Sequence, residues 1–226
     1  QGRDVNALMT AGQLINWGMP ALAADMLNAL DCQRTLPLYL QASLLPKAER
    51  GELVVKAIDA FPQFVRFPNT LEEVAALESI EECWFARHLL ACFYYNKRSY
   101  GKAIALWQRC VEMSPEFADG WRGLAIHAWN KQHDYELAAR YLDNAYQLAP
   151  QDARLLFERD LLDKLSGVTP EKRLARLENN LEIALKRDDM TAELLNLWHL
   201  TGQADKAADI LATRKFHPWE GCLLYT

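Results

Sequence analysis

The sequence predicts an all-α fold in which antiparallel helix pairs stack into a continuous array. An aromatic residue, a small residue and a proline recur after 35 residues, first as Tyr100, Ala103 and Pro115 and again as Tyr135, Ala138 and Pro150. A period of this length is typical of helix-turn-helix repeats. The 10 Gly and 9 Pro residues are few for 226 positions, and the prolines fall mostly between segments of helical apolar periodicity, so short turns separate the helices. Signals for β-strands are weak throughout.

The N-terminal region, residues 1–69, is predicted to hold two helix pairs and a connector. Residues 5–30 and 35–60 each carry an apolar stripe that glycine and proline interrupt near its middle. Residues 61–69 form an aromatic run bounded by prolines. Because this run is too apolar for a free linker, we expect it to pack against the helices on either side.

Residues 70–217 are predicted to form a solenoid, followed by a C-terminal tail at 218–226. Helices are expected at 70–79, 82–97, 100–113, 117–131, 134–148, 151–165, 170–185, 189–201 and 204–213. Thr169 before Pro170 indicates a helix start, and Gly202 indicates a helix end. Small residues such as Ala103 and Ala138 let the two helices of a pair approach closely, and each pair leaves one face that only a neighbouring pair can cover.

These residues resemble the tetratricopeptide repeat (TPR), most clearly over 84–115 and 118–150 and more loosely near 194–217. The matching residues of the two clear repeats are Leu90, Ala91, Tyr94, Ala103, Trp107, Cys110 and Pro115, and Trp121, Leu124, Ala125, Ala138, Leu142, Ala145 and Pro150. The second repeat departs from the pattern, because Ala128 replaces a tyrosine and the loop with Gln132 and His133 has one extra residue. The resemblance implies a right-handed superhelix whose concave groove is lined by the first helix of each pair.

A narrower resemblance covers roughly 35–221 and concerns the repeat region of large bacterial proteins. It is carried by Phe64-Val65-Arg66-Phe67-Pro68, Phe157-Glu158-Arg159-Asp160, Arg187-Asp188-Asp189 and Phe216-His217-Pro218-Trp219-Glu220-Gly221. In those proteins a domain of unknown function, expected to be a β-sandwich with a carbohydrate connection, precedes the repeats. The resemblance implies that this chain is a fragment. After Gly221 the sequence leaves the pattern, so we assign no function to Cys222.

The TPR frame places six residues in the groove, as candidates for binding a partner. They are His88, Tyr95, Asn96, Arg122, Trp129 and Asn130. The alternative for His88 and Trp129 is that they are partly buried packing residues, and the sequence leaves both readings open. The carboxylate clamp that grips chaperone tails in some TPR proteins is absent, because Cys92 and Ile126 stand where it has asparagine.

The sequence predicts no metal site, no cofactor and no catalytic centre. His88 and Cys92 share a helical face, but a structural zinc site needs four convergent ligands. Four acidic residues, Glu158, Asp160, Asp188 and Asp189, offer carboxylates for a glycosidase pair, yet nothing in their spacing requires them to converge. No GxSxG, phosphate-loop or HExxH motif occurs, so we expect that the chain is not an enzyme.

The net charge, the hydropathy and the cysteines indicate which partners and which cellular location to expect. The net charge of −5 and the pI near 5.6 argue against nucleic acid as a partner. No apolar run is long enough for a membrane span, so we expect no membrane contact and a cytoplasmic location, provided that the chain is complete. The five cysteines are odd in number and lie mainly in helical patterns, and we expect reduced thiols.

Together these observations predict a scaffold that binds a protein partner, or a neighbouring domain of its parent protein, through the groove. The alternative is an accessory module of a carbohydrate-processing enzyme, in which Trp121 and Trp129 stack on sugar rings. The segment from His217 to Glu220 is expected to dock on the last helix, or else to join the repeats to a further domain. The sequence does not identify the partner.

Overall fold

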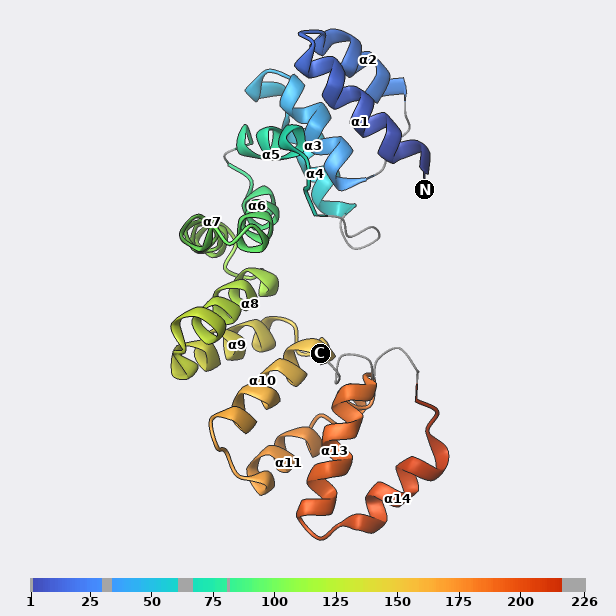
Figure 1. Cartoon of the computed structure of the whole chain (residues 1–226), viewed down its shortest axis with the longest axis vertical. Coiled ribbons are helices and arrows are strands. Elements are labelled where there is room, and N and C mark those ends of the chain that lie inside the picture. The colour runs from blue at the N-terminus through green and yellow to red at the C-terminus, as the bar shows by residue number, and fades with distance from the viewer. Residues whose placement is uncertain (1, 30–33, 61–66, 81, 217–226) are drawn as a thin grey trace. The chain divides into compact units, whose positions relative to one another are not determined.

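A computed structural model describes residues 2–29, 34–60, 67–80 and 82–216 (Figure 1), with side chains from residue 6 onward. Every regular element in these residues is helical, which confirms the predicted all-α fold. None of these helices combines the length and the apolar character that crossing a bilayer requires. The chain divides into two compact units, residues 1–115 (the N-terminal unit) and 116–226 (the C-terminal unit). The division into 1–69, 70–217 and 218–226 follows the repeat pattern and stays a prediction.

Among its described residues, the N-terminal unit contains three helix pairs and a single intervening helix. The pairs are α1 (Gly2–Asn16) with α2 (Pro20–Ala29), α3 (Thr35–Leu44) with α4 (Gly51–Asp59), and α6 (Trp84–Asn96) with α7 (Tyr100–Met113). A short 3-10 turn, η1 (Lys47–Glu49), lies between α3 and α4, and α5 (Leu71–Glu78) packs on α3 and α6. Most of the predicted connector, residues 61–66, lies outside the described residues. Phe67 is exposed and Pro68 is buried.

In the C-terminal unit, residues 116–216 are described and contain three further helix pairs. They are α8 (Ala118–His127) with α9 (Tyr135–Leu148), α10 (Ala153–Leu165) with α11 (Pro170–Glu178), and α13 (Asp188–Leu200) with α14 (Ala204–Thr213). A π-helical turn, η3 (Ala128–Gln132), extends α8, and a short helix, α12 (Leu181–Ala184), connects α11 to α13. Thr169 precedes α11 and Pro170 is its first residue, as predicted. The segment from His217 to Glu220, for which docking was predicted, lies outside the described residues.

The prediction of one helix at 170–185 is wrong, because α11 ends at Glu178 and α12 begins at Leu181. The break lies at Asn180, whose backbone leaves helical geometry (φ −127°, ψ 34°). Its Nδ2 donates to the carbonyl of Arg176 at 2.9 Å, and its Oδ1 accepts from the hydroxyl of Tyr146 at 2.7 Å. Asparagine side chains that bond to nearby groups compete with helical backbone bonding, so α11 ends although the apolar stripe continues.

Residues with positive φ mark the turns within the helix pairs. In the described part of the chain they are Gly18, Arg98, His133, Gly167 and Gly202, with φ between 55° and 77°. From Arg98 onward they follow one another after 35, 34 and 35 residues. The repeat therefore continues through α10 and α11, where the family pattern is hard to see. A left-handed backbone suits glycine best, so Arg98 and His133 hold it at a cost in free energy.

The extra residue predicted near Gln132 and His133 is taken up by η3. At the four other described turns, the N–H after the positive-φ residue donates to a carbonyl five residues earlier: Met19 to Leu14, Ser99 to Tyr94, Val168 to Asp163 and Gln203 to Trp198, at 2.8 to 2.9 Å. At His133 the corresponding N–H, that of Asp134, reaches six residues back to Ala128 at 3.0 Å. The turn closes around one more residue, and Ala138 of α9 is buried just as Ala103 of α7 is.

The core of the C-terminal unit shows how successive pairs stack. One cluster of buried residues surrounds Leu142 and joins α8, α9 and α10. A second surrounds Leu177 and joins α10, α11 and α13. Helix α10 contributes Leu155 to the first cluster and Leu156 to the second. The first helix of one pair therefore covers the second helix of the pair before it, as the repeat argument predicts.

Three of the five cysteines lie in described residues, Cys83, Cys92 and Cys110, and all three are reduced thiols. Cys83 and Cys110 are buried. Burial raises the pKa of Cys110 to about 12, so this thiol stays protonated at neutral pH. Cys32 and Cys222 lie outside the described residues.

Candidate binding face

The N-terminal unit holds three of the predicted groove residues, all on α6. His88 is 5% exposed and stacks on Phe85, with ring centroids 6.0 Å apart. Tyr95 is half-buried against the ring of Tyr100, at a centroid distance of 5.1 Å, and Asn96 is exposed. In this unit Asn96 is therefore the predicted residue most open to a ligand, whereas His88 acts in packing.

The other three predicted residues belong to the C-terminal unit. Arg122 lies on α8 and is partly exposed. Trp129 lies in η3, is half-buried and packs against the cluster around Leu142. Asn130, its neighbour, is exposed. The assignment of all six residues to one groove stays a prediction.

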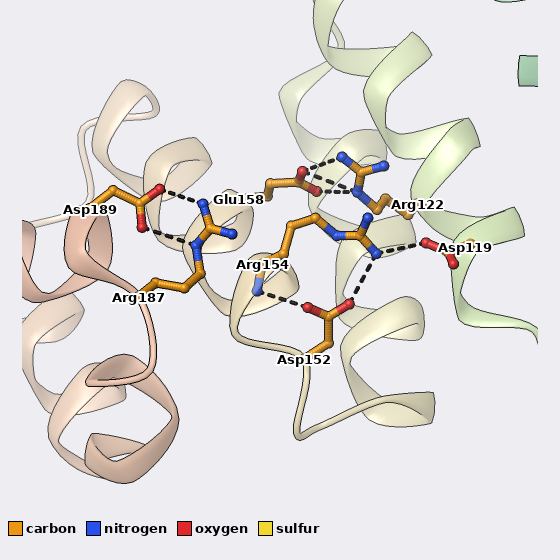
Figure 2. A network of polar contacts seen from close by, with 7 residues as sticks. All are labelled: Asp119, Arg122, Asp152, Arg154, Glu158, Arg187 and Asp189. Atoms are coloured by element: carbon orange, nitrogen blue, oxygen red, sulfur yellow. Dashed lines mark hydrogen bonds and ion pairs between the residues drawn. The ribbon is translucent and has the colours of Figure 1, made fainter. Parts of the chain in front are cut away.

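Arg122 belongs to a network of charged side chains between α8 and α10, shown in Figure 2. Its Nε donates to Glu158 Oε2 at 2.8 Å, and its Nη2 donates to Oε1 of the same carboxylate. The side chains of Arg122 and Glu158 are 25% and 16% exposed. This two-point contact fixes both side chains in orientation, which a single contact would not do.

A second arginine ties the same two helices together. Nη2 of Arg154, on α10, donates to Asp119 Oδ1 on α8 at 2.8 Å and to Asp152 Oδ2 at 3.0 Å. Asp152 also caps α10, because its Oδ1 accepts from the backbone N–H of Arg154 at 2.8 Å. We call Asp119, Arg122, Asp152, Arg154 and Glu158 the α8–α10 ladder.

The repeat explains why these charges meet. Asp119 and Arg154 are 35 residues apart, and Arg122 and Glu158 are 36 apart. A separation of one repeat places residues at equivalent positions on neighbouring first helices. Residues three or four apart on one helix share a face, so Arg122 joins Asp119, and Glu158 joins Arg154. A search for opposite charges one repeat apart would have found the ladder, whereas the search for single groove positions found Arg122 alone.

The electrostatics of the ladder keep Arg122 charged. Burial lowers the pKa of Arg122, but its hydrogen bonds to Glu158 and the charges of Glu158, Asp119 and Asp152 outweigh this effect and raise the pKa overall. The two guanidinium groups of the ladder face three carboxylates, so its formal charge is −1. A partner that binds this face therefore contacts positively charged hydrogen-bond donors and negatively charged acceptors, all held in fixed positions.

A further arginine, Arg187, immediately precedes α13. Nε of Arg187 donates to Asp189 Oδ1 at 3.0 Å (Figure 2). The guanidinium carbon of Arg187 is 5.6 Å from the ring centroid of Phe157 on α10. A cation at this distance from an aromatic face is attracted to it. The charged face of the C-terminal unit therefore runs from α8 over α10 to the start of α13.

The four carboxylates considered for catalysis are all bound by arginine. Glu158 pairs with Arg122, Asp160 with Arg173, Asp188 with Arg214 and Asp189 with Arg187. These contacts hold the four carboxylates in place within the C-terminal unit. In the described residues the structure also brings together no group of three or more His, Cys, Asp or Glu side chains able to hold a metal ion.

Comparison with known proteins supports the fold. No protein-family model matches the sequence. The solved structure of MamA protein is similar with a TM-score of 0.51 and 14% identity, covering 79% of this chain and 88% of that one. TTC0263, a thermophilic TPR protein of Thermus thermophilus, has a TM-score of 0.49 and 18% identity, with coverage of 84% and 95%. YrrB, a TPR protein with an unusual peptide-binding site, has a TM-score of 0.47 and 18% identity, with coverage of 79% and 83%.

The likeness to MamA and the turns that recur every 34 or 35 residues define the class of fold. The chain has an all-α, TPR-type fold of antiparallel helix pairs. At 14% identity the likeness establishes the fold and nothing about a ligand.

Proposed function

We propose that the chain is a TPR-type scaffold that binds a protein partner, or a neighbouring domain of its parent protein, and that the α8–α10 ladder is part of its binding face. The observation that carries this proposal is the position of the ladder on two successive first helices, which line the groove in the TPR arrangement. Its side chains are fixed by one another and are still partly exposed. Groups held in place before binding lose little entropy when a partner bonds to them.

Asn130 of the C-terminal unit presents an exposed amide, and Asn96 presents another in the N-terminal unit, where it is considered by itself. An amide both donates and accepts hydrogen bonds, and it therefore suits the backbone of an extended peptide. Trp121 fits the sugar-stacking alternative poorly, because its ring lies 5.9 Å from that of Tyr141 and packs on the cluster around Leu142. A protein partner is therefore the better match for this face.

A charge swap tests the proposal without removing the salt bridge. In the double variant Arg122→Glu with Glu158→Arg, the pair keeps opposite charges but presents them from exchanged helices. We expect affinity capture with the wild-type chain to recover partners that the swapped chain loses, while thermal unfolding stays similar. The matched control exchanges Glu52 and Lys56 on α4, an exposed pair at 2.6 Å, and should keep those partners. Identical capture by all three chains would place the binding face elsewhere.

Trp129 separates a groove role from a packing role. If Trp129 contacts the partner, Trp129→Ala lowers binding and leaves the melting temperature nearly unchanged. If it serves the core, the same change costs about 3 to 5 kcal/mol of stability. Pairing it with Tyr95→Ala extends the test to both units. A rise in melting temperature with a simple sugar would instead favour the carbohydrate-processing alternative, since a ligand of the folded state stabilises it.

We further propose that the chain is part of a larger bacterial protein and that this protein is cytoplasmic. The described cysteines Cys83, Cys92 and Cys110 are reduced, which suits a reducing compartment. The parent protein follows from the narrower resemblance over 35–221. Detection of the chain within a longer polypeptide, by an antibody against residues 84–150 in cell fractions, would test both statements.

A further inference from the structure

The helix pair of α6 and α7 carries positive charge in a chain that is otherwise acidic. Residues 83–111 contain five Lys and Arg residues and no Asp or Glu, so their formal charge is +5. The whole chain has a formal charge of −5, and the remaining residues therefore carry −10. Charge of one sign gathered in a single helix pair indicates a local site for a group of the opposite sign.

Three of these cations gather where α6 turns into α7. Lys97 and Arg98 lie in the turn, Lys102 lies in the first turn of α7, and all three are exposed. Nζ of Lys97 is 5.6 Å from the ring centroid of Phe93, and Nζ of Lys102 is 5.0 Å from that of Tyr94. The two rings meet edge to face with centroids 5.4 Å apart, so a single aromatic pair attracts both ammonium groups. We call Lys97, Arg98 and Lys102 the α6–α7 basic patch.

The charge of this patch is not neutralised by ion pairs of its own. Within the described residues, no carboxylate lies at ion-pair distance from any of its three cations, whereas Arg109, further along α7, pairs with Glu112 at 3.1 Å. Glu78 lies close by, because its Oε1 accepts from the hydroxyl of Tyr94 at 2.6 Å. Even with Glu78 counted, the patch keeps a formal charge of +2.

The backbone of Arg98 gives a second reason to regard the patch as functional. Its φ is 61°, and the corresponding turns of two later helix pairs hold Gly167 and Gly202 at this position. Glycine adopts the left-handed conformation without steric cost, and histidine, as at His133, is found in it more often than most residues, but arginine has neither advantage. The chain therefore carries an arginine where glycine would be more stable. Strained residues of this kind cluster at functional sites.

We propose that the α6–α7 basic patch binds an acidic segment of a partner protein, through ion pairs between its three cations and glutamate or aspartate side chains. A short run of carboxylates matches the patch in sign and extent. A nucleic acid fits less well, because its affinity grows with the number of phosphates neutralised and a long strand also approaches the rest of the chain, whose formal charge is −10. An anionic membrane calls for clusters of about four to eight Lys or Arg residues, more than the patch supplies.

This inference goes beyond the proposed function. The patch belongs to the N-terminal unit and shares no residue with the α8–α10 ladder. It also differs from a carboxylate clamp, because its cations pair with side chains and do not require the terminus of a chain. An acidic run inside a partner sequence is therefore sufficient.

The test measures the binding of a fluorescent oligoglutamate peptide, blocked at both ends, to the full chain by anisotropy at low ionic strength. The double variant Lys97→Gln with Lys102→Gln should bind at least about threefold more weakly, which is the loss expected for two exposed ion pairs. Oligoglutamine of the same length should not bind. Binding should also weaken as salt is added, because the Debye length falls to about 3 Å at 1 M.

The matched control is Arg140→Gln with Lys172→Gln, which changes two exposed residues and shifts the net charge by the same amount. This variant should bind the peptide as the wild type does, and so should the charge swap at Arg122 and Glu158.

Arg98→Gly provides a further readout, in which binding and stability change in opposite directions. It should bind the peptide about twofold more weakly or worse, because one cation is lost. It should also raise the melting temperature, because glycine relieves the left-handed backbone. A residue that serves folding alone would not combine these two effects.

Three results would overturn the proposal. Oligoglutamate does not bind the wild-type chain up to millimolar concentration, or the patch variant and the matched control lose affinity equally. In the third, single-stranded DNA of the same length binds more tightly than oligoglutamate and loses affinity with the patch variant, and the ligand of the patch is then a nucleic acid.

Discussion

Removal of Asp160 should destabilise the C-terminal unit by about 3 to 5 kcal/mol, because it leaves an arginine buried without its main partner. Nε and Nη2 of Arg173, on α11, donate to the two oxygens of Asp160, on α10, at 3.1 and 2.6 Å. The side chains of Arg173 and Asp160 are 5% and 2% exposed. Burial alone lowers the pKa of Arg173, but its bonds to Asp160 and Glu193 raise it overall, so the group remains charged. In Asp160→Ala, the charge of Arg173 retains its hydrogen bond to Glu193. Glu193 compensates this charge only in part, because the same carboxylate also binds Lys164.

The assay is urea unfolding followed by circular dichroism, applied to a double-mutant cycle of Asp160→Ala, Arg173→Met and the two together. Removing both partners should cost less than the sum of the single changes, because no buried charge is then left without its partner. Glu52→Ala, which removes one partner of an exposed pair, should leave the urea midpoint of unfolding essentially unchanged. The reasoning fails if Asp160→Ala costs less than about 1 kcal/mol, or if the two single changes simply add.

Three other predictions concern the turns, the core and pH. His133→Gly should raise the free energy of unfolding by about 1 kcal/mol by relieving a left-handed backbone, and Gly167→Ala should lower it by a similar amount; opposite signs in urea titrations would contradict this. Leu177→Ala should lower the free energy of unfolding by about 2 to 5 kcal/mol, because it leaves a cavity in the core. Leu211→Ala, at an exposed position, should change it by no more than about 0.5 kcal/mol. Equal shifts in melting temperature for the two variants would contradict this difference. Burial raises the pKa of Glu193, but bonds from Lys164 and Arg173 outweigh this and hold it below the ordinary 4.5. A carboxyl whose pKa is depressed by folding contributes stability above its unfolded pKa and loses it as pH falls through the folded pKa. The unfolding free energy of the wild type should therefore fall below pH 4.5 more steeply than that of Glu193→Gln, and parallel curves would count against this role.

The helix pairs could be predicted from the sequence because their signals are local. The prolines, glycines and apolar stripes placed α7 and α14 at their observed bounds, Tyr100–Met113 and Ala204–Thr213. The break at Asn180 could not be predicted this way, since it depends on a bond from Tyr146, which lies 34 residues earlier in the chain. Periodicity within one segment carries no information about such a partner.

The candidate site was harder to predict than the fold. The repeat frame identifies positions on a helix face, but burial at those positions depends on neighbours from other helices. His88 occupies such a position and is buried beside Phe85. Arg122 occupies the equivalent one and is held by Glu158 of the next repeat. The pairing of Arg122 with Glu158 can be recognised only by comparing positions one repeat apart in two repeats. The pattern within a single helix contains no such information.

The wide turn η3 shows how this chain accommodates a change of length. The added residue is contained in the π-helical turn before His133. Because the turn absorbs it, α9 packs as the second helix of the preceding repeat does, with Ala138 buried. Single-residue insertions in such turns should therefore have little effect on the packing of the helix pairs. They alter what the corner displays, here Trp129 and Asn130, and a modular protein can in this way vary its surface while its interior stays the same.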